Sequence, residues 1–244
     1  MEKLIFELTR LYLPAGAVSP ELLARHLLGR ETHAMPLVAA DGSTRAMAIR
    51  FAPAGANPGD LHWTSLCDTA NALQSVYGFP APGVSVCADG SGGFRLWVAF
   101  QTPVPAARAQ GFLELLHRAH FPDLALEADA VSRPVELPPC MNQDTGRWSA
   151  FINPGMGASF VDEPGLEMSP PPAAQAAFLE DLQPVGAPEF ERALRMLEGA
   201  EQPAQAAPSA SSSGDLLLRD ATLEDIVRHL HAKHIEPTFR HLIR

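Results

Sequence analysis

The chain has few cysteines, and their number and spacing exclude two common kinds of site. Cys67, Cys87 and Cys140 are the only three among 244 residues. An odd number of widely separated cysteines matches neither a disulfide framework nor the paired ligands of a zinc site. We therefore expect buried free thiols in a protein of the reducing cytoplasm.

Long apolar runs and leader signals are also missing. The N-terminus, MEKLIFELTRLYL, carries acidic residues and has no cleavage site after a long apolar core, so it does not read as a signal peptide. No stretch approaches the roughly 20 apolar residues of a membrane-spanning helix. The sequence predicts a soluble, cytoplasmic protein with no membrane partner.

Positive charge is scarce. Eighteen basic and 28 acidic residues give a net charge of −10, which argues against nucleic-acid binding over the whole surface and leaves room only for a local basic patch. Sixteen of the 18 basic residues are arginine. Arginine suits phosphate recognition, but the bias of a GC-rich genome gives the same composition, and we favour that interpretation.

Apolar residues make up 46% of the chain, enough to form a core. The rest of the chain is organised around residues 84–100, where the runs VSVC and LWVAF flank the turn DGSGG. This pattern predicts two strands joined by a tight turn. Glycines let a backbone or a phosphate approach closely, although an ordinary hairpin loop has the same sequence pattern.

Helices and hairpins alternate along the rest of the chain. The apolar spacing predicts helices over 2–13, 20–28, 61–77, 105–120, 173–182 and 187–199, a hairpin over 35–51, short strands or loop edges at 125–131 and 134–137, and a glycine-broken strand pair over 151–162. The fold class is therefore α+β with a mixed or antiparallel sheet.

Composition divides the chain into four parts. We predict a main domain over residues 1–184, a helix over 185–200, a flexible linker over 201–214 and a helical tail over 215–244. The linker sequence, EQPAQAAPSASSSG, has no periodic apolar face. The tail is too short to fold alone, so we expect it to dock on the main domain or on a partner.

Three fragments follow one another along the chain: HLLGRETHAMPLVAADGSTRAMAIRF, SGGFRLWVAF and GASFVDEPGLEMSPPPAAQAAFLEDL. Together they resemble the archaeo-eukaryotic primase superfamily, in particular the primase-polymerase branch of bacterial mobile and conflict systems and of CRISPR-associated systems. The resemblance covers about residues 12–183. It implies a primase-polymerase-like (RRM-like) core, with a mixed or antiparallel sheet and flanking helices.

The residues that would carry out catalysis in that family are replaced. Arg50 and Ala52 stand where the family has Asp-x-Asp, and Arg95 stands where it has a histidine that contacts the nucleotide phosphates. Only the acid of the third motif remains, as Asp162. Two-metal phosphoryl transfer needs several carboxylates, and an arginine would repel a divalent cation. The resemblance implies the fold, whereas these residues imply that there is no catalytic residue, no metal and no polymerisation.

The altered positions suggest a metal-free phosphate site. Strand alternation places Arg50 on the face opposite Ile49 and Phe51, and it places Arg95 opposite Leu96. Beside Asp162, the two arginines would bind a phosphate through charge-assisted hydrogen bonds. The predicted phosphate-binding set is Arg50, Arg95, Ser91, Gly92, Gly93 and Asp162. In the alternative interpretation, Arg50 and Asp162 form a structural ion pair.

Two tryptophans receive different predictions. Trp97 lies inside an apolar strand and should be part of the core. Trp148 follows Asp144-Thr145-Gly146-Arg147 and is the exposed candidate for stacking on a base.

We therefore expect an inactive primase-like domain that binds a nucleotide or single-stranded nucleic acid, or acts as a scaffold, in replication, reverse transcription or CRISPR defence. A polymerase, reverse transcriptase, helicase or CRISPR component would bind through residues 201–244. One alternative is an active Mg- or Mn-dependent primase-polymerase with relocated ligands, Asp162 with Glu163 or Asp60. Another is a structural subunit that binds only protein.

Overall fold

The computed structural model describes residues 1–52, 61–89, 92–161 and 165–201. The chain divides into two units, Met1–Gln202 and Pro203–Arg244, and the description below concerns the first. The predicted helical tail and nearly all of the predicted linker lie outside the described residues.

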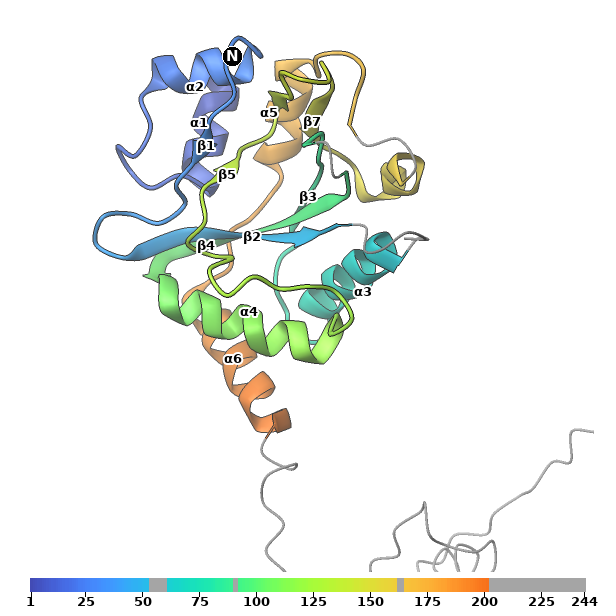
Figure 1. The fold of residues 1–244 in the computed structure, drawn as a ribbon. Helices are drawn as coiled ribbons and strands as arrows, with labels where there is room; N and C mark the ends of the chain where they lie inside the picture. The colour runs from blue at the N-terminus through green and yellow to red at the C-terminus, as the bar shows by residue number, and fades with distance from the viewer. Residues whose placement is uncertain (53–60, 90–91, 162–164, 202–244) are drawn as a thin grey trace, which may run out of the picture. The chain divides into compact units, whose positions relative to one another are not determined.

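The described residues form a mixed α+β fold (Figure 1), as the alternation of helices and hairpins predicted. The helices are α1 (Glu2–Leu11), α2 (Pro20–Leu27), α3 (Leu61–Ser75), α4 (Ala106–His120), α5 (Pro172–Glu180), α6 (Ala187–Glu201) and the 3₁₀ helix η1 (Pro154–Phe160). The strands are β1 (Ala34–Met35), β2 (Ser43–Phe51), β3 (Gly83–Val86), β4 (Phe94–Pro105), β5 (Val135–Glu136), β6 (Cys140–Met141) and β7 (Trp148–Phe151).

Five of these strands form one antiparallel sheet in the order β2-β4-β3-β7-β6. β2 and β4 make the longest pairing, from Ser43 opposite Pro105 to Phe51 opposite Phe94, with a register shift between Thr44 and Ala46. β1 and β5 form a separate two-stranded ribbon. Because β2 pairs only with β4 in this sheet, it is an edge strand, and this edge carries the candidate site.

Each face of the sheet has its own hydrophobic cluster because side chains alternate along the strands. Met47, Ile49 and Phe51 of β2 pack in the first cluster with α3, α4 and α6. Ala46 and Ala48 pack in the second cluster with α1, α2, α5 and the β1–β5 ribbon. In Figure 1, α4 and α6 lie below β2 and β4, whereas α1, α2 and α5 lie above them.

The glycine-rich hairpin is confirmed. β3 and β4 pair from Gly83 opposite Trp97 to Val86 opposite Phe94, and the Cys87 N–H donates to the Gly93 carbonyl at 2.9 Å. Trp97 is buried, as predicted, and its indole N–H donates to Ser85 Oγ at 2.8 Å. That bond satisfies the one polar group of the buried indole.

The predicted hairpin over 35–51 is wrong in its first strand. Met35 pairs with Val135 of β5 and not with β2. Of the predicted first strand, Val38 pairs with β2, through an isolated bridge to Thr44. Met35 and Leu37 are buried in the second cluster. The gain from burying these side chains draws the chain away from β2, which turn chemistry alone does not show.

The predicted strand pair over 151–162 is also wrong. β7 ends at Phe151, and Pro154–Phe160 form the 3₁₀ helix η1. Asn153 caps this helix, since its side-chain Oδ1 accepts from the Gly155 N–H at 2.9 Å. An Asn-Pro-Gly sequence supplies both an N-cap and a proline at the first helical position, which favours a helical turn over a strand.

Candidate functional site

A cavity of about 380 Å³ lies beside the edge strand β2. Its walls come from the end of β2, the start of β4, the turn after β3, one residue of α4 and the segment 125–135. The polar side chains of the lining are Arg50, Asp89, Arg95, Glu127 and Arg133, and the remaining lining is apolar. A concave, mostly apolar space of this size with a few convergent polar groups is typical of a small-ligand site.

Arg50 and Arg95 stand directly opposite each other on β2 and β4. They share the sheet face of Ala48 and Trp97, as the alternation predicted. Two like charges directly opposite in an antiparallel pair destabilise a sheet. An anionic group between them removes this cost, and the fold supplies one.

That group is Asp89, which follows β3. Arg50 forms a two-pronged ion pair with it, NH1 to Oδ2 at 2.6 Å and NH2 to Oδ1 at 3.0 Å. Arg95 NH2 lies 3.7 Å from the same Oδ2. The side chains are 27%, 14% and 23% exposed for Arg50, Arg95 and Asp89, so solvent screens the cluster only partly.

The cavity is locally positive in an acidic protein. Three arginines and two carboxylates line it, an excess of one positive charge, whereas the whole chain carries −10. Arg133 pairs with Glu127 and Asp129, so the excess centres on Arg50 and Arg95. Burial opposes the charge of Arg50, but the hydrogen-bonded Asp89 carboxylate favours it, and the Arg50 pKa is raised.

The structure brings together part of the predicted phosphate-binding set. Arg50 and Arg95 line one cavity, whereas Ser91 and Asp162 lie outside the described residues. Gly92 and Gly93 have positive φ values of 68° and 86°, which glycine adopts without strain. Their described contacts use carbonyl oxygens: Gly92 accepts from Arg50, and Gly93 accepts from Cys87. Their role in binding phosphate stays a prediction.

Trp148 does not present an exposed ring. It is 7% exposed, which makes the prediction of an exposed stacking residue wrong. β7 lies inside the sheet between β3 and β6, and Leu166 pairs with Trp148 through backbone hydrogen bonds. The indole ring also packs against Gly29. Burial on these sides leaves no open face on which a base could stack.

Sequence reasoning missed Asp89, Glu127 and Arg133. Asp89 belongs to the glycine-rich turn, and a turn that closes a β3–β4 hairpin must lie near the first residues of β4, including Arg95. That signal could have placed Asp89 beside Arg95. Nothing local could have shown that β2 lies next to β4 and brings Arg50 to the same turn.

The cysteines near this end of the sheet are not nucleophiles. Cys87 and Cys140 are buried free thiols, as expected. Burial raises the pKa of Cys87, and it raises the pKa of Cys140 to about 12. A thiol that stays protonated at neutral pH does not attack an electrophile.

The described residues do not fit the metals that the primase resemblance implies. Arg50 and Ala52 offer no ligand at the Asp-x-Asp positions, and Arg50 engages both carboxylate oxygens of Asp89. Among residues 1–52, 61–89, 92–161 and 165–201, no group of three or more His, Cys, Asp or Glu side chains could hold a metal ion. The proposed relocated ligands Asp60, Asp162 and Glu163 lie outside those ranges.

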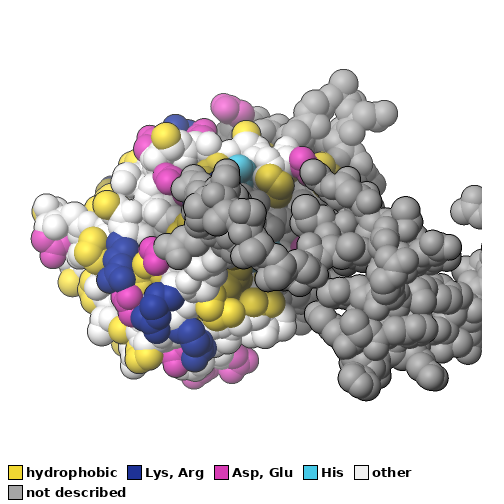
Figure 2. Space-filling view, turned by 90° about the horizontal axis from the view of Figure 1, so that it is seen from below, with side chains coloured by type: hydrophobic (Ala, Val, Ile, Leu, Met, Phe, Trp, Pro, Cys, Tyr) yellow, Lys and Arg dark blue, Asp and Glu magenta, His cyan; other side chains and the backbone are white. Residues whose placement is uncertain are grey.

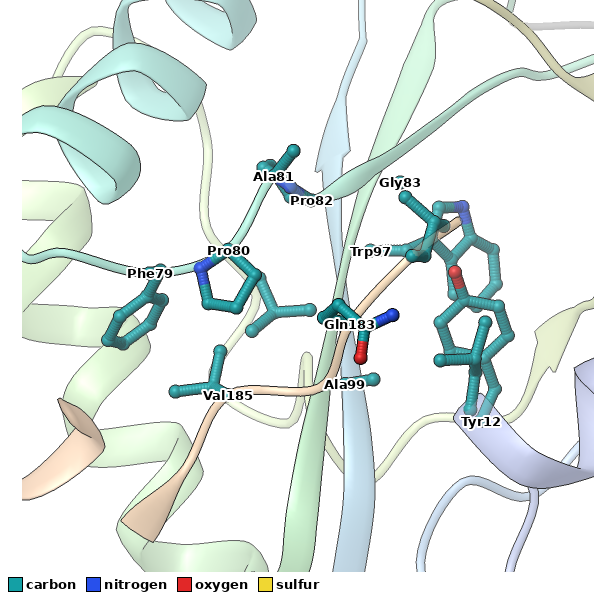
Figure 3. Close-up of a pocket in the computed structure, with 13 residues that line it drawn as sticks. Tyr12, Phe79, Pro80, Ala81, Pro82, Gly83, Trp97, Ala99, Gln183 and Val185 are labelled. Carbon is teal, nitrogen blue, oxygen red and sulfur yellow. The ribbon is translucent and has the colours of Figure 1, made fainter. Parts of the chain in front are cut away.

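A second space, between α1 and β3–β4, is too small for a ligand. Tyr12, Gly83, Trp97 and Gln183 lie around it (Figure 3), and its volume is about 10 Å³. Such a space holds about one water molecule. Burial raises the pKa of Tyr12, so the phenol is neutral and gives no charge to this part of the core.

Where Figure 2 leaves the α4 and α6 face uncovered, basic side chains do not form a broad surface. In the visible part of this face, Lys and Arg side chains stand next to Asp, Glu and hydrophobic side chains (Figure 2). An ion pair between Arg108 and Glu191 joins α4 to α6. In the part of the chain that the structure describes, no helix is long and apolar enough to cross a membrane.

No family model matches the chain, and no curated protein matches it. The functional argument therefore rests on the cavity and the residues that line it.

Proposed function

We propose that this chain is a primase-like binding module that holds the phosphate of a nucleotide or a single strand between Arg50 and Arg95 and does not polymerise. The observation that carries the proposal is the direct pairing of these two arginines in the lining of one cavity. Charge-assisted hydrogen bonds from an arginine fork fit a phosphate group.

The fold supports the primase-like part of the proposal through its element order. β2, α3, β3, β4, α4 and β7 follow one another as β-α-β-β-α-β, with the short β5 and β6 inserted before β7. β4 lies between β2 and β3 in the sheet, so the first β-α-β unit is split, as in ferredoxin-like and RRM-type folds. β7 pairs with β3, whereas the fourth strand of those folds lies beside the first, so the match covers β2, β3 and β4 and not β7. The helical η1 where the resemblance expects a strand counts against it.

Asp89 already neutralises part of the positive charge of Arg50 and Arg95. This observation favours a second candidate function. In that candidate, the Arg50–Asp89 pair is structural, and the chain binds only protein. The two functions differ in one measurable property: only a binding module gains free energy from an added phosphate. Partners that would bind through residues 201–244, such as a polymerase or helicase, stay a prediction.

The test is a calorimetric titration of the full chain with a nucleoside triphosphate and, separately, with a single-stranded oligonucleotide. We expect Arg50→Ala with Arg95→Ala to weaken binding roughly tenfold or more, because each charge-assisted contact contributes roughly 1.5–3 kcal/mol. EDTA should leave the parent unaffected. A control with Arg25→Ala and Arg108→Ala removes the same charge from two surface ion pairs and should change affinity less than twofold.

Each contrary result selects an alternative. Binding that EDTA abolishes would point to relocated metal ligands and should then be accompanied by Mn- or Mg-dependent primer synthesis. If the parent protein binds neither probe at low or moderate salt, the remaining interpretation is a structural subunit that binds only protein. Circular dichroism of each variant establishes that it is folded.

A further inference from the structure

A larger cavity, of about 540 Å³, lies beside β7, near the edge of the sheet that is farther from β2. We call it the β7 groove and define it by Arg147, Phe151, Ile152, Met156, Leu166 and Met168. Pro170 and Pro171, which precede α5, form part of its wall. It shares no lining residue with the cavity of Arg50 and Arg95, so it is a separate site.

The groove has an apolar lining that meets solvent. Met156 is 58% exposed and Met168 is 80% exposed, although both are large hydrophobic side chains. Unbranched thioether side chains adapt to differently shaped apolar partners, and proteins use them at surfaces that bind peptides. Prolines on the wall hold the backbone in a fixed conformation, which lowers the entropy lost on binding.

Arg147 is the arginine of this lining, and one of its guanidinium nitrogens makes no hydrogen bond. Arg147 NH1 is buried and has no hydrogen-bond partner. Its NH2 lies 4.0 Å from Glu167 Oε1, and the Glu167 side chain is 81% exposed. That separation is too long for a hydrogen bond. The Arg147 side chain as a whole is 34% exposed, so an incoming carboxylate can reach the accessible part of its guanidinium and form a charge-assisted hydrogen bond there.

We propose that the β7 groove binds a peptide segment of a partner protein that presents a large apolar side chain next to a carboxylate. The apolar side chain enters between the methionines and Phe151, and the carboxylate meets Arg147. Nucleic acid fits less well, since its backbone needs several cations and this lining offers one arginine opposed by Glu167. The proposal goes beyond the phosphate site and does not depend on it.

The test uses the full chain and a synthetic array of decapeptides in which one aromatic or aliphatic residue stands next to Asp, Glu or a free C-terminal carboxylate. We expect the array to retain the protein, with at least tenfold weaker binding when the apolar residue becomes alanine or the acid becomes lysine. Decanoic acid and a single-stranded oligonucleotide should not displace the bound peptide.

Two variants tie the binding to this groove. Arg147→Gln removes the cation, and Met168→Glu places a negative charge on an exposed side chain that folding does not require. Each should weaken peptide binding at least tenfold. Met196→Glu is the matched control, because Met196 is an exposed methionine on α6, 43% exposed, and lines neither cavity. It should bind as the parent does.

Three results would overturn the proposal. One is an array on which no peptide is retained. Another is unchanged peptide binding by Met168→Glu, which stays informative even if Arg147→Gln fails to fold. The third is displacement by decanoic acid or by the oligonucleotide, which would assign the groove to a lipid-like acid or to nucleic acid. Triphosphate binding at Arg50 and Arg95 should be unchanged in all three variants.

Discussion

Asp89 is the residue that decides what the two central arginines can do. Arg50 and Arg95 face each other across β2 and β4, and the Asp89 carboxylate lies within ion-pair distance of both. An incoming phosphate must therefore compete with a carboxylate that Arg50 already holds through two contacts. Under the proposed function, Asp89 competes with the phosphate, and the affinity depends on how easily Asp89 gives way.

Asp89→Asn should separate a binding site from a structural ion pair. The amide keeps the shape of the carboxylate and removes its charge, so phosphate affinity should rise roughly fivefold to tenfold if Arg50 and Arg95 bind phosphate. Calorimetric titration with inorganic triphosphate measures this rise. Asp41→Asn is the control, because Asp41 lies in an exposed turn where it bonds Ser43, and it should leave affinity unchanged.

A purely structural pair predicts the reverse for Asp89→Asn. Its midpoint of thermal unfolding should then fall with no gain in phosphate binding, because a partly buried Arg50 loses its charged partner. An affinity equal to that of the parent, together with a lower midpoint, would contradict the phosphate site.

At the scale of elements, α2 and β7 pack closely because Gly29, just after α2, lies against the indole of Trp148 in β7. Gly29 follows α2 with φ of +68°, a conformation that favours glycine. A Cβ at this position would lie 2.5 Å from Trp148 Cη2 and 3.2 Å from Met141 Cβ. The fixed indole and the backbone conformation together require glycine, and this contact is part of what buries Trp148.

Gly29→Ala should therefore cost more stability than an ordinary glycine replacement. We expect a loss of roughly 2–4 kcal/mol in the free energy of unfolding, from left-handed backbone strain and from overpacking against the indole. Gly16→Ala is the matched control, since Gly16 has φ of +72° and no atom within 4 Å of an added Cβ. Its loss should be roughly 1 kcal/mol.

Urea unfolding of both variants measures the difference. Equal losses at Gly29 and Gly16 would show that the backbone conformation alone matters and that the indole of Trp148 yields without cost.

At the scale of the molecule, the first unit contains both hydrophobic clusters. Their buried members run from Leu4 to Leu197. α6 is part of this core, because Phe190 is buried and its ring centroid lies 5.1 Å from that of Phe100 and 5.3 Å from that of Phe112. The helix predicted over 185–200 thus completes the packing of α4 and β4.

A chain that ends at Gln202 should keep the stability of the full chain. We expect its midpoint of thermal unfolding to lie within about 3 °C of the parent value, which corresponds to about 1 kcal/mol for a unit of this size. A chain that ends at Gly186 loses Phe190 and Leu197 from the core and should show no cooperative transition. Scanning calorimetry of the three chains measures both outcomes. A fall of more than about 6 °C at Gln202 would mean that residues 203–244 stabilise the first unit.

The sequence by itself determined the features that depend on neighbours along the chain. Ser19 caps α2, its Oγ accepting from the Leu22 N–H at 3.2 Å, and the glycine-rich hairpin has the predicted strands. Alternation along β2 also placed Arg50 on the face opposite Ile49. Capping, turns and alternation are set by a few adjacent residues, so a sequence pattern is enough to predict them.

Only the tertiary structure decided the contacts between distant segments. The pairing of β1 with β5, the burial of Trp148 and the partner of Arg50 were not readable from the sequence. Arg50 and Asp89 are 39 residues apart, and they meet because β4 pairs with both β2 and β3. Which apolar face packs on which, and hence which charges meet at the sheet edge, is settled by the burial of the whole core and not by any local pattern.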